Sequence, residues 1–325
     1  METMFTILWQ IVTMILLAAV GYLMHTSGKI SQEGSKALGN ILIYLSLPCV
    51  IVKSFLVERT PERISGFFIS ALMAGLTLAV SMLLARILLG RYAIDNFAGS
   101  FSNPGFFGTP LIIASVGSGG VFYIASFIAF LNLLQWTYGV SLLQASDKNG
   151  LLPRRGETRT ATQGKPTQQI AQLSVRLLKA PFMIAILIGG FFFFTGAPMP
   201  SVLEKCIDSI AAMNTPIAMF TIGIYMAQVD ILKMFRKPRL YLVSLVRMVL
   251  IPAATVGMLM LLPASMNELK LAVLIASACP VGSNVAVYAQ MHDRDYRYAV
   301  ETVVISTLFS IITLPLVVGL ADVIF

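Results

Sequence analysis

Two short stretches of the chain place asparagine, proline and glycine inside otherwise apolar sequence. Residues 102–110 read Ser-Asn-Pro-Gly-Phe-Phe-Gly-Thr-Pro, and residues 278–284 read Ala-Cys-Pro-Val-Gly-Ser-Asn. Proline breaks a helix because it has no backbone N–H. A helix that is broken inside a membrane must be buried in protein or line a wet cavity, and paired breaks of this kind indicate a transport site. The candidate substrate-binding residues are Asn103, Pro104, Gly105, Pro280, Gly282, Ser283 and Asn284.

The chemistry that these residues predict is the binding of an anion. A second half-helix would begin at each break, because asparagine is a strong N-cap and proline is favoured at the first helical position. The new helix start offers unpaired N–H groups and the positive end of the helix dipole, which attract anions. Two such ends near the membrane midplane would bind a carboxylate without any full positive charge. The alternative is a pair of structural kinks in which Asn103 and Asn284 only cap the freed backbone.

Charged and amide side chains elsewhere in the apolar sequence are further candidates. Arg247 and Glu301 are expected at similar depths near the cytoplasmic side and are predicted to form an ion pair. The pair either holds two helices together or acts in transport, with Glu301 as a proton-coupling group or Arg247 as an anion contact. Asn132 and Gln135 are expected beside the breaks, where they either bind substrate or hydrogen-bond between helices. None of the 15 Asp and Glu residues is expected at mid-membrane, which argues against a cation antiporter.

The elements that must position these residues are membrane-spanning helices. The chain is 57% apolar and only 12% charged, and its apolar runs of about 18–25 residues suit a hydrocarbon core ~30 Å thick. We predict an all-α polytopic membrane protein with ten spans, two of them broken. The spans are expected near residues 5–24, 38–57, 64–89, 97–116, 121–143, 178–195, 202–228, 240–262, 269–290 and 298–324.

The spans divide into two repeats of five, residues 1–144 and 173–325, joined by a polar linker at residues 145–172. An odd number of spans per repeat makes the second copy inverted relative to the first. Most of the 23 Lys and Arg residues lie in connections on one side, so the positive-inside rule places the linker in the cytoplasm and both termini outside, in the plasma membrane. Prolines occupy matching places in the two halves, namely Pro48 with Pro216 and Pro104 with Pro280.

The composition also excludes several function classes. The net charge of +8 does not predict nucleic-acid binding, because the basic residues lie in short loops without interleaved aromatic residues. The three Cys and two His residues have no metal-ligand spacing, so no metal or other cofactor is expected. The chain has no His-Glu-x-x-His motif, no paired intramembrane aspartates and no Walker A motif, which argues against an enzyme and against ATP-driven transport.

Residues 103–111 resemble the fourth-span motif of the auxin efflux carrier family, which includes the plant PIN carriers and bacterial organic-acid carriers. Residues 132–139 resemble the fifth span of that family, and residues 306–316 are similar to its last span, so the resemblance covers essentially the whole chain. It implies the crossover fold shared with bile acid symporters and sodium/proton antiporters. Spans 1, 2, 6 and 7 would form a scaffold, and spans 3–5 and 8–10 would form a moving transport domain.

One departure from the family's pattern and one difference from the bile acid symporters bear on the site. The sixth span of the family often opens with Asn-Pro, whereas this chain has Ala180-Pro181, which removes any substrate contact made by that asparagine. Sodium coupling of the bile-acid-symporter kind uses an acid just after the second break, where this chain reads Asn284-Val285-Ala286-Val287. Sodium coupling is therefore not expected, and protons are the candidate coupling ion; the alternative is sodium bound by neutral oxygens.

The residues and the resemblance together predict a secondary transporter of a small organic anion, such as an auxin-like acid or a dicarboxylate. It would work by elevator-type alternating access in the lipid bilayer, and a homodimer through the scaffold is a candidate assembly. The alternatives are a channel or a membrane-embedded sensor built on the same fold.

Overall fold

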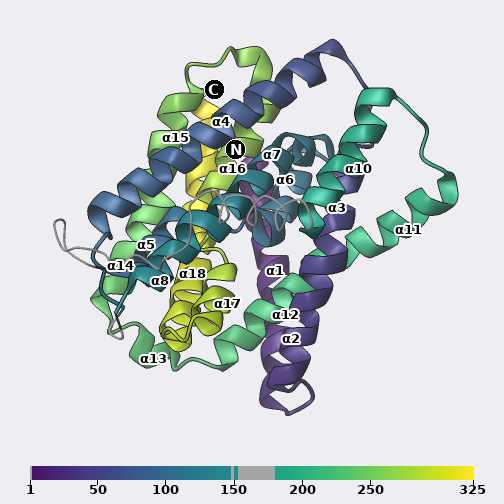
Figure 1. Cartoon of the computed structure of the whole chain (residues 1–325). Coiled ribbons are helices and arrows are strands. Elements are labelled where there is room, and N and C mark those ends of the chain that lie inside the picture. The colour runs from purple at the N-terminus through teal and green to yellow at the C-terminus, as the bar shows by residue number, and fades with distance from the viewer. Residues whose placement is uncertain (1, 148–149, 153–179) are drawn as a thin grey trace, which may run out of the picture.

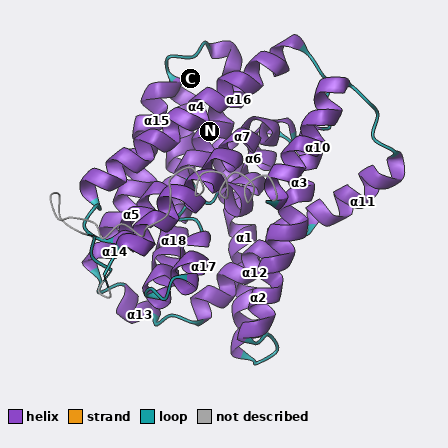
Figure 2. Cartoon of the chain, in the orientation of Figure 1, coloured by secondary structure: helices purple, strands orange, loops and turns teal. Residues whose placement is uncertain are grey.

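The computed structural model describes residues 2–147, 150–152 and 180–325, and every regular element in that part of the chain is helical (Figure 2). Helices occupy all ten of the ranges predicted as spans. Within the described residues, seven continuous helices are long and apolar enough to cross a membrane, and shorter apolar helices lie at 104–116 and 181–195. The prediction of an all-α polytopic membrane protein is confirmed. Residues 178–179 and most of the predicted linker lie outside the described residues.

The elements of the first half follow the predicted spans closely (Figure 1). They are α1 (Glu2–Thr26), α2 (Gln32–Ile41), η1 (Leu42–Ser46), α3 (Leu47–Phe55), α4 (Pro61–Leu88), α5 (Ala93–Ser100), η2 (Pro104–Gly108), α6 (Thr109–Val116), α7 (Gly119–Leu134), η3 (Gln135–Gly139) and α8 (Val140–Ala145).

The second half also consists of helices, and one of its predicted spans is interrupted between α16 and α17. Its elements are α10 (Pro181–Thr195), α11 (Ser201–Ala212), α12 (Asn214–Ala227), α13 (Ile231–Met234), α14 (Pro238–Leu245), η4 (Val246–Leu250), α15 (Ile251–Leu259), η5 (Ala264–Met266), α16 (Asn267–Ala278), α17 (Asn284–Met291) and α18 (Tyr296–Ile324).

Prolines explain three widened turns inside these helices. The π turns η1, η2 and η4 each end two residues before a proline. A proline cannot donate to the carbonyl four residues back and its ring clashes with that carbonyl. The residue before it therefore donates to the carbonyl five residues back, which defines a π turn. These bonds join Leu47 N to Leu42 O, Thr109 N to Pro104 O and Ile251 N to Val246 O, ahead of Pro48, Pro110 and Pro252.

Helices from the two halves pack against each other. Helix α1 lies along α12, and α3 lies against α10 and α11 (Figure 1). The α1–α12 contact is backbone to backbone, because a Cβ added at Gly21 would lie 2.3 Å from the carbonyl oxygen of Phe220, and one at Gly223 would lie 1.8 Å from that of Ala18. Small residues that allow such close approach are typical of helix contacts in membranes.

Candidate functional site

The two stretches of asparagine, proline and glycine interrupt their helices and touch each other. Residues 101–103 separate α5 from η2 and α6, and residues 279–283 separate α16 from α17. Ser102 and Val281 pair as an antiparallel bridge. The N–H of Gly282 donates to the carbonyl oxygen of Phe101 at 3.0 Å. The backbones approach so closely that a Cβ at Gly282 would lie 2.8 Å from the carbonyl oxygen of Ser102, so this position requires glycine.

Helix α18 contributes a side-chain hydrogen bond that stabilises the Ser102–Val281 bridge. The hydroxyl of Ser306 accepts a hydrogen bond at 3.0 Å from the N–H of Val281, and the Ser306 side chain is fully buried. A broken helix leaves such donors unpaired, and an unpaired buried donor costs about 1–3 kcal/mol. Ser306 therefore stabilises the extended backbone of the second break.

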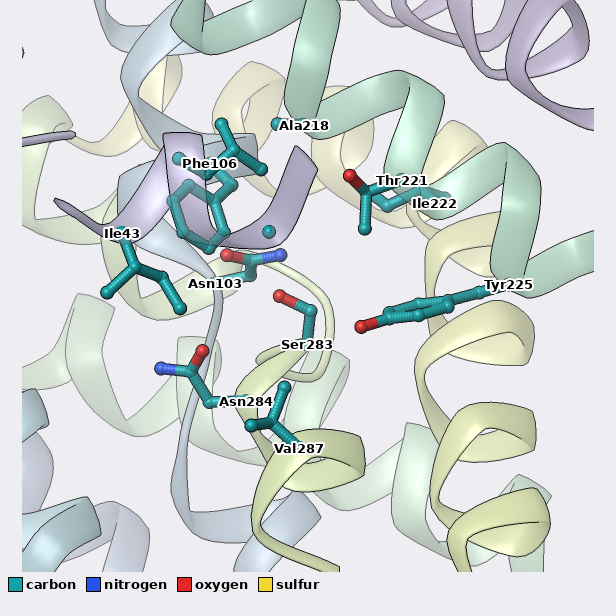
Figure 3. A pocket seen from close by; sticks show the side chains of 12 residues that line it. Ile43, Asn103, Phe106, Ala218, Thr221, Ile222, Tyr225, Ser283, Asn284 and Val287 are labelled. Atoms are coloured by element: carbon teal, nitrogen blue, oxygen red, sulfur yellow. The ribbon is translucent and has the colours of Figure 1, made fainter. Parts of the chain in front are cut away.

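A small cavity adjoins the two breaks (Figure 3). Its volume of about 30 Å³ is the space of roughly one water molecule. In Figure 3 the side chains of Asn103 and Ser283 lie next to each other, and the Tyr225 hydroxyl points toward them from α12. The lining residues are Gly39, Leu42, Ile43, Asn103, Phe106, Ala218, Thr221, Ile222, Tyr225, Ser283, Asn284 and Val287.

Asn103 stands at the predicted N-cap position of the second half-helix but does not cap it through its side chain. The Asn103 carbonyl oxygen instead accepts from the N–H groups of Phe107 and Gly108 at 3.0 and 3.1 Å. Among the described residues no hydrogen bond to the Asn103 amide is found, although the residue is only 5% exposed. A buried amide without an internal partner is available to a ligand in the cavity.

Asn284, in contrast, is not at an N-cap position, because it is the first residue of α17. Its Nδ2 donates to Oε1 of Gln135 at 2.9 Å. Gln135 is fully buried in η3, and its own Nε2 has no hydrogen-bond partner within the described chain. The amide pair therefore fixes the orientation of Asn284 across the two helices and leaves a donor on Gln135 unused.

The other predicted site residues divide into two groups. Pro104, Gly105, Pro280 and Gly282 shape the backbone of the breaks and do not line the cavity. Asn132 lies apart from the cavity and donates to the carbonyl oxygen of Ile128 in its own helix at 2.8 Å.

Three polar residues near the breaks were not predicted. Thr221 and Tyr225 line the cavity from α12, one helical turn apart, and the only signal for them was this spacing of polar residues in an apolar helix. Asn214 donates from Nδ2 to the carbonyl oxygen of Gly105 at 3.1 Å. That carbonyl needs a partner because Pro110, five residues on, has no N–H to close the π turn.

The predicted ion pair between Arg247 and Glu301 is not formed. Arg247 is 1% exposed, and its guanidinium donates to the carbonyl oxygens of Gly99 and Ser100 at 3.2 and 3.3 Å and to that of Ser277. Glu301 instead accepts from Nζ of Lys237 at 2.5 Å. The helix ends leave carbonyl groups without partners, and these groups hold the arginine in place of the glutamate.

A second buried acid lies near Glu301. Asp95, in the first turn of α5, accepts two hydrogen bonds from Arg239 at 2.8 and 2.9 Å. The Arg239 guanidinium also lies 3.4 Å from the centre of the Tyr92 ring, a cation–π contact. The predicted span began at residue 97, whereas the helix begins at Ala93, so Asp95 was placed outside the span. The acids near the N-terminal ends of α5 and α18 are therefore neutralised by cations of α14 and the residue before it.

A larger apolar cavity, of about 360 Å³, lies between α1 and α12 on one side and Phe107 and α18 on the other. It shares Ile222 with the small cavity. Its lining residues are Met14, Ile15, Ala18, Ala19, Tyr22, Leu23, Phe107, Met219, Ile222, Met226, Ile231, Thr307, Leu308 and Ile311.

Comparison with known proteins gives one family and two relatives. Residues 6–318 match the family described as "Membrane transport protein". A protein of Rhizobium meliloti named "Putative malonate transporter" is 25% identical over 309 residues, which cover 90% of this chain and 89% of that protein. A protein of Methanothermobacter thermautotrophicus named "Uncharacterized transporter" is 22% identical over 318 residues, covering 94% of this chain and 95% of the relative.

Proposed function

The chain belongs to the membrane transport protein family, and from this premise we propose that it is a secondary carrier of a small organic anion in the plasma membrane. The family and the names of its relatives indicate a transporter rather than an enzyme. The proposal rests on Asn103, whose buried amide has no hydrogen-bond partner among the described residues and lies beside Ser283. The amide N–H and the serine hydroxyl are neutral donors at the point where the two helix breaks meet.

The proposed architecture is ten spans in two inverted repeats, residues 1–144 and 173–325, with both termini outside and the 145–172 linker in the cytoplasm. Reciprocal packing supports the inverted repeat. The first helix of the first half, α1, packs on α12 in the second span of the second half, and the first helix of the second half, α10, packs on α3 in the second span of the first. A two-fold axis in the membrane plane would produce this exchange.

The proposed substrate is a carboxylate. Asn103, Ser283 and the α12 hydroxyls of Thr221 and Tyr225 provide polar contacts around the cavity, and no acid among the described residues lines it. One relative is named for malonate, a dicarboxylate that belongs to the same chemical class. Short mono- and dicarboxylates are therefore the compounds to test first.

The proposed mechanism is elevator-type alternating access. The small cavity is lined on one side by η1 and α12, which would belong to the scaffold, and on the other by the breaks of the transport domain. A space for one water molecule cannot hold a dicarboxylate, so the two groups of helices would separate to admit substrate. Protons as the coupling ion and a homodimer through the scaffold complete the proposal.

Counterflow in proteoliposomes tests the function. Vesicles preloaded with one unlabelled acid are mixed with trace labelled malonate, and a panel of mono- and dicarboxylates is then used as the internal acid. A carrier accumulates label against its gradient and saturates with external acid. Label that only equilibrates, without saturation, would indicate a channel, and exchange driven by cations or neutral solutes but by no carboxylate would overturn the anion proposal.

A further inference from the structure

The C-terminal ends of two half-helices meet on one buried arginine. The guanidinium of Arg247 donates to the carbonyl oxygens of Gly99 and Ser100, the last two residues of α5, and to that of Ser277 near the end of α16. Arg247 is the largest fully buried side chain in the described part of the chain. No carboxylate within the described residues pairs with it; its contacts are three backbone oxygens.

These oxygens form a site for a cation. The last four carbonyl groups of a helix have no partner within it, and the helix dipole places negative charge at that end. Two such ends that face each other in a membrane interior need a positive charge between them. Hard metal cations also bind to backbone carbonyl oxygens. Either a dissociable ion or a fixed side chain could therefore fill the position, and here the side chain of Arg247 fills it.

The local backbone directs Arg247 to this position. The residue lies in the π turn η4, which Pro252 imposes two residues beyond its end. A π turn adds one residue to the helical turn and rotates the side chains on either side of it. The planar guanidinium has several donors in a fixed arrangement, so one side chain can bond two helix ends at once.

We propose that Arg247 is a fixed cation between the C-terminal ends of α5 and α16, where it takes the place of a dissociable coupling cation. As a positioning residue, it holds the two helices together next to the Ser102–Val281 bridge. This inference rests on the proposed function. It predicts that transport proceeds without sodium, since the position where a metal ion could bind is already occupied, and that removing Arg247 creates a new binding site for a small cation.

The test uses wild type, Arg247→Gln, Arg247→Lys and the exposed control Arg86→Gln in two measurements. Thermal unfolding of the purified protein is followed as choline chloride is replaced by sodium or potassium chloride at constant ionic strength. Uptake of the best carboxylate into proteoliposomes is measured in the same salts. Arg86→Gln removes an equal charge from an exposed position.

We expect wild type and Arg86→Gln to transport equally in choline and in sodium, with no cation-specific thermal shift. Arg247→Gln should lose at least tenfold of its uptake in choline and should show a saturable thermal shift with sodium or potassium. Arg247→Lys should be intermediate, because one ammonium group cannot reach all three oxygens with the same geometry.

Sodium-dependent uptake by wild type, or unchanged uptake by Arg247→Gln without any cation-specific shift, would overturn the inference. If Arg247→Gln does not fold, wild-type uptake in choline and the response of Arg247→Lys still decide it. If wild type moves no carboxylate in any salt, the proposed function fails, whereas the cation-specific thermal shift still tests the role of Arg247.

Discussion

Substitution of Asn103 by alanine separates ligand binding from helix capping. The residue is 5% exposed and its amide makes no capping bond. A hydrogen bond from an amide to a carboxylate contributes about 1.5–3 kcal/mol. Because ~1.4 kcal/mol corresponds to a factor of ten in affinity, Asn103→Ala should raise the dissociation constant of the substrate by roughly 10- to 100-fold.

The stability of the unliganded protein should change little in this variant, because no hydrogen bond of the described structure is lost. A capping asparagine would behave in the opposite way, with a loss of about 0.5–2 kcal/mol of stability and no change in affinity. Both quantities come from one assay, in which thermal unfolding of the purified protein is titrated with malonate and with the best acid from the counterflow panel.

Asn132→Ala is the matched control. It removes the same chemical group from a partly buried position whose only observed bond is to its own helix, so affinity should change less than about twofold, since no ligand contact is lost. The reasoning would be refuted if Asn103→Ala bound substrate as wild type does while unfolding at a clearly lower temperature, or if Asn132→Ala weakened binding as strongly as Asn103→Ala.

Three further substitutions test the packing around the site. Gly282→Ala should cost about 1–3 kcal/mol in thermal unfolding, because its Cβ would lie 2.8 Å from a backbone oxygen; an unchanged melting temperature would contradict this close approach. Asn214→Ala should cost about 1–3 kcal/mol by leaving the Gly105 carbonyl unpaired; an unchanged melting temperature would show that this bond adds no stability. Lys237→Gln should cost about 3–5 kcal/mol because Glu301 would remain buried and unpaired, and the double variant with Glu301→Gln should recover much of this loss.

The sequence was sufficient to predict the helices and the places where they break. Long apolar runs define membrane helices by length alone, and Pro104 and Pro280 lack the backbone N–H that an uninterrupted helix needs. Gln135, which was expected beside the breaks together with Asn132, hydrogen-bonds to Asn284. These features depend on residue type and on position along a helix axis, which the sequence contains directly.

The sequence was not sufficient for contacts that depend on direction around a helix. Arg247 and Glu301 were expected at similar depths, but Glu301 pairs with Lys237, which precedes α14, and the arginine in the π turn η4 donates to backbone oxygens. Those oxygens carry no residue-specific signal, since every helix ends with unpaired carbonyl groups. Asp95 was missed for another reason, because a helix edge shifted by four residues moved it from a predicted loop into a buried turn.

Helix α1 is packed tightly on the side that faces α12 and borders a cavity on the side that faces α18. Toward α12, the glycines leave no space between the backbones, and any shift there would force atoms into overlap. Toward α18, α1 and α12 border an apolar cavity whose lining includes Met14 of α1 and Met219 and Met226 of α12. Methionine side chains are unbranched and adapt to irregular surfaces. The α1–α12 pair therefore combines a tight internal contact with an adaptable face toward α18, where thioether side chains can rearrange in small steps.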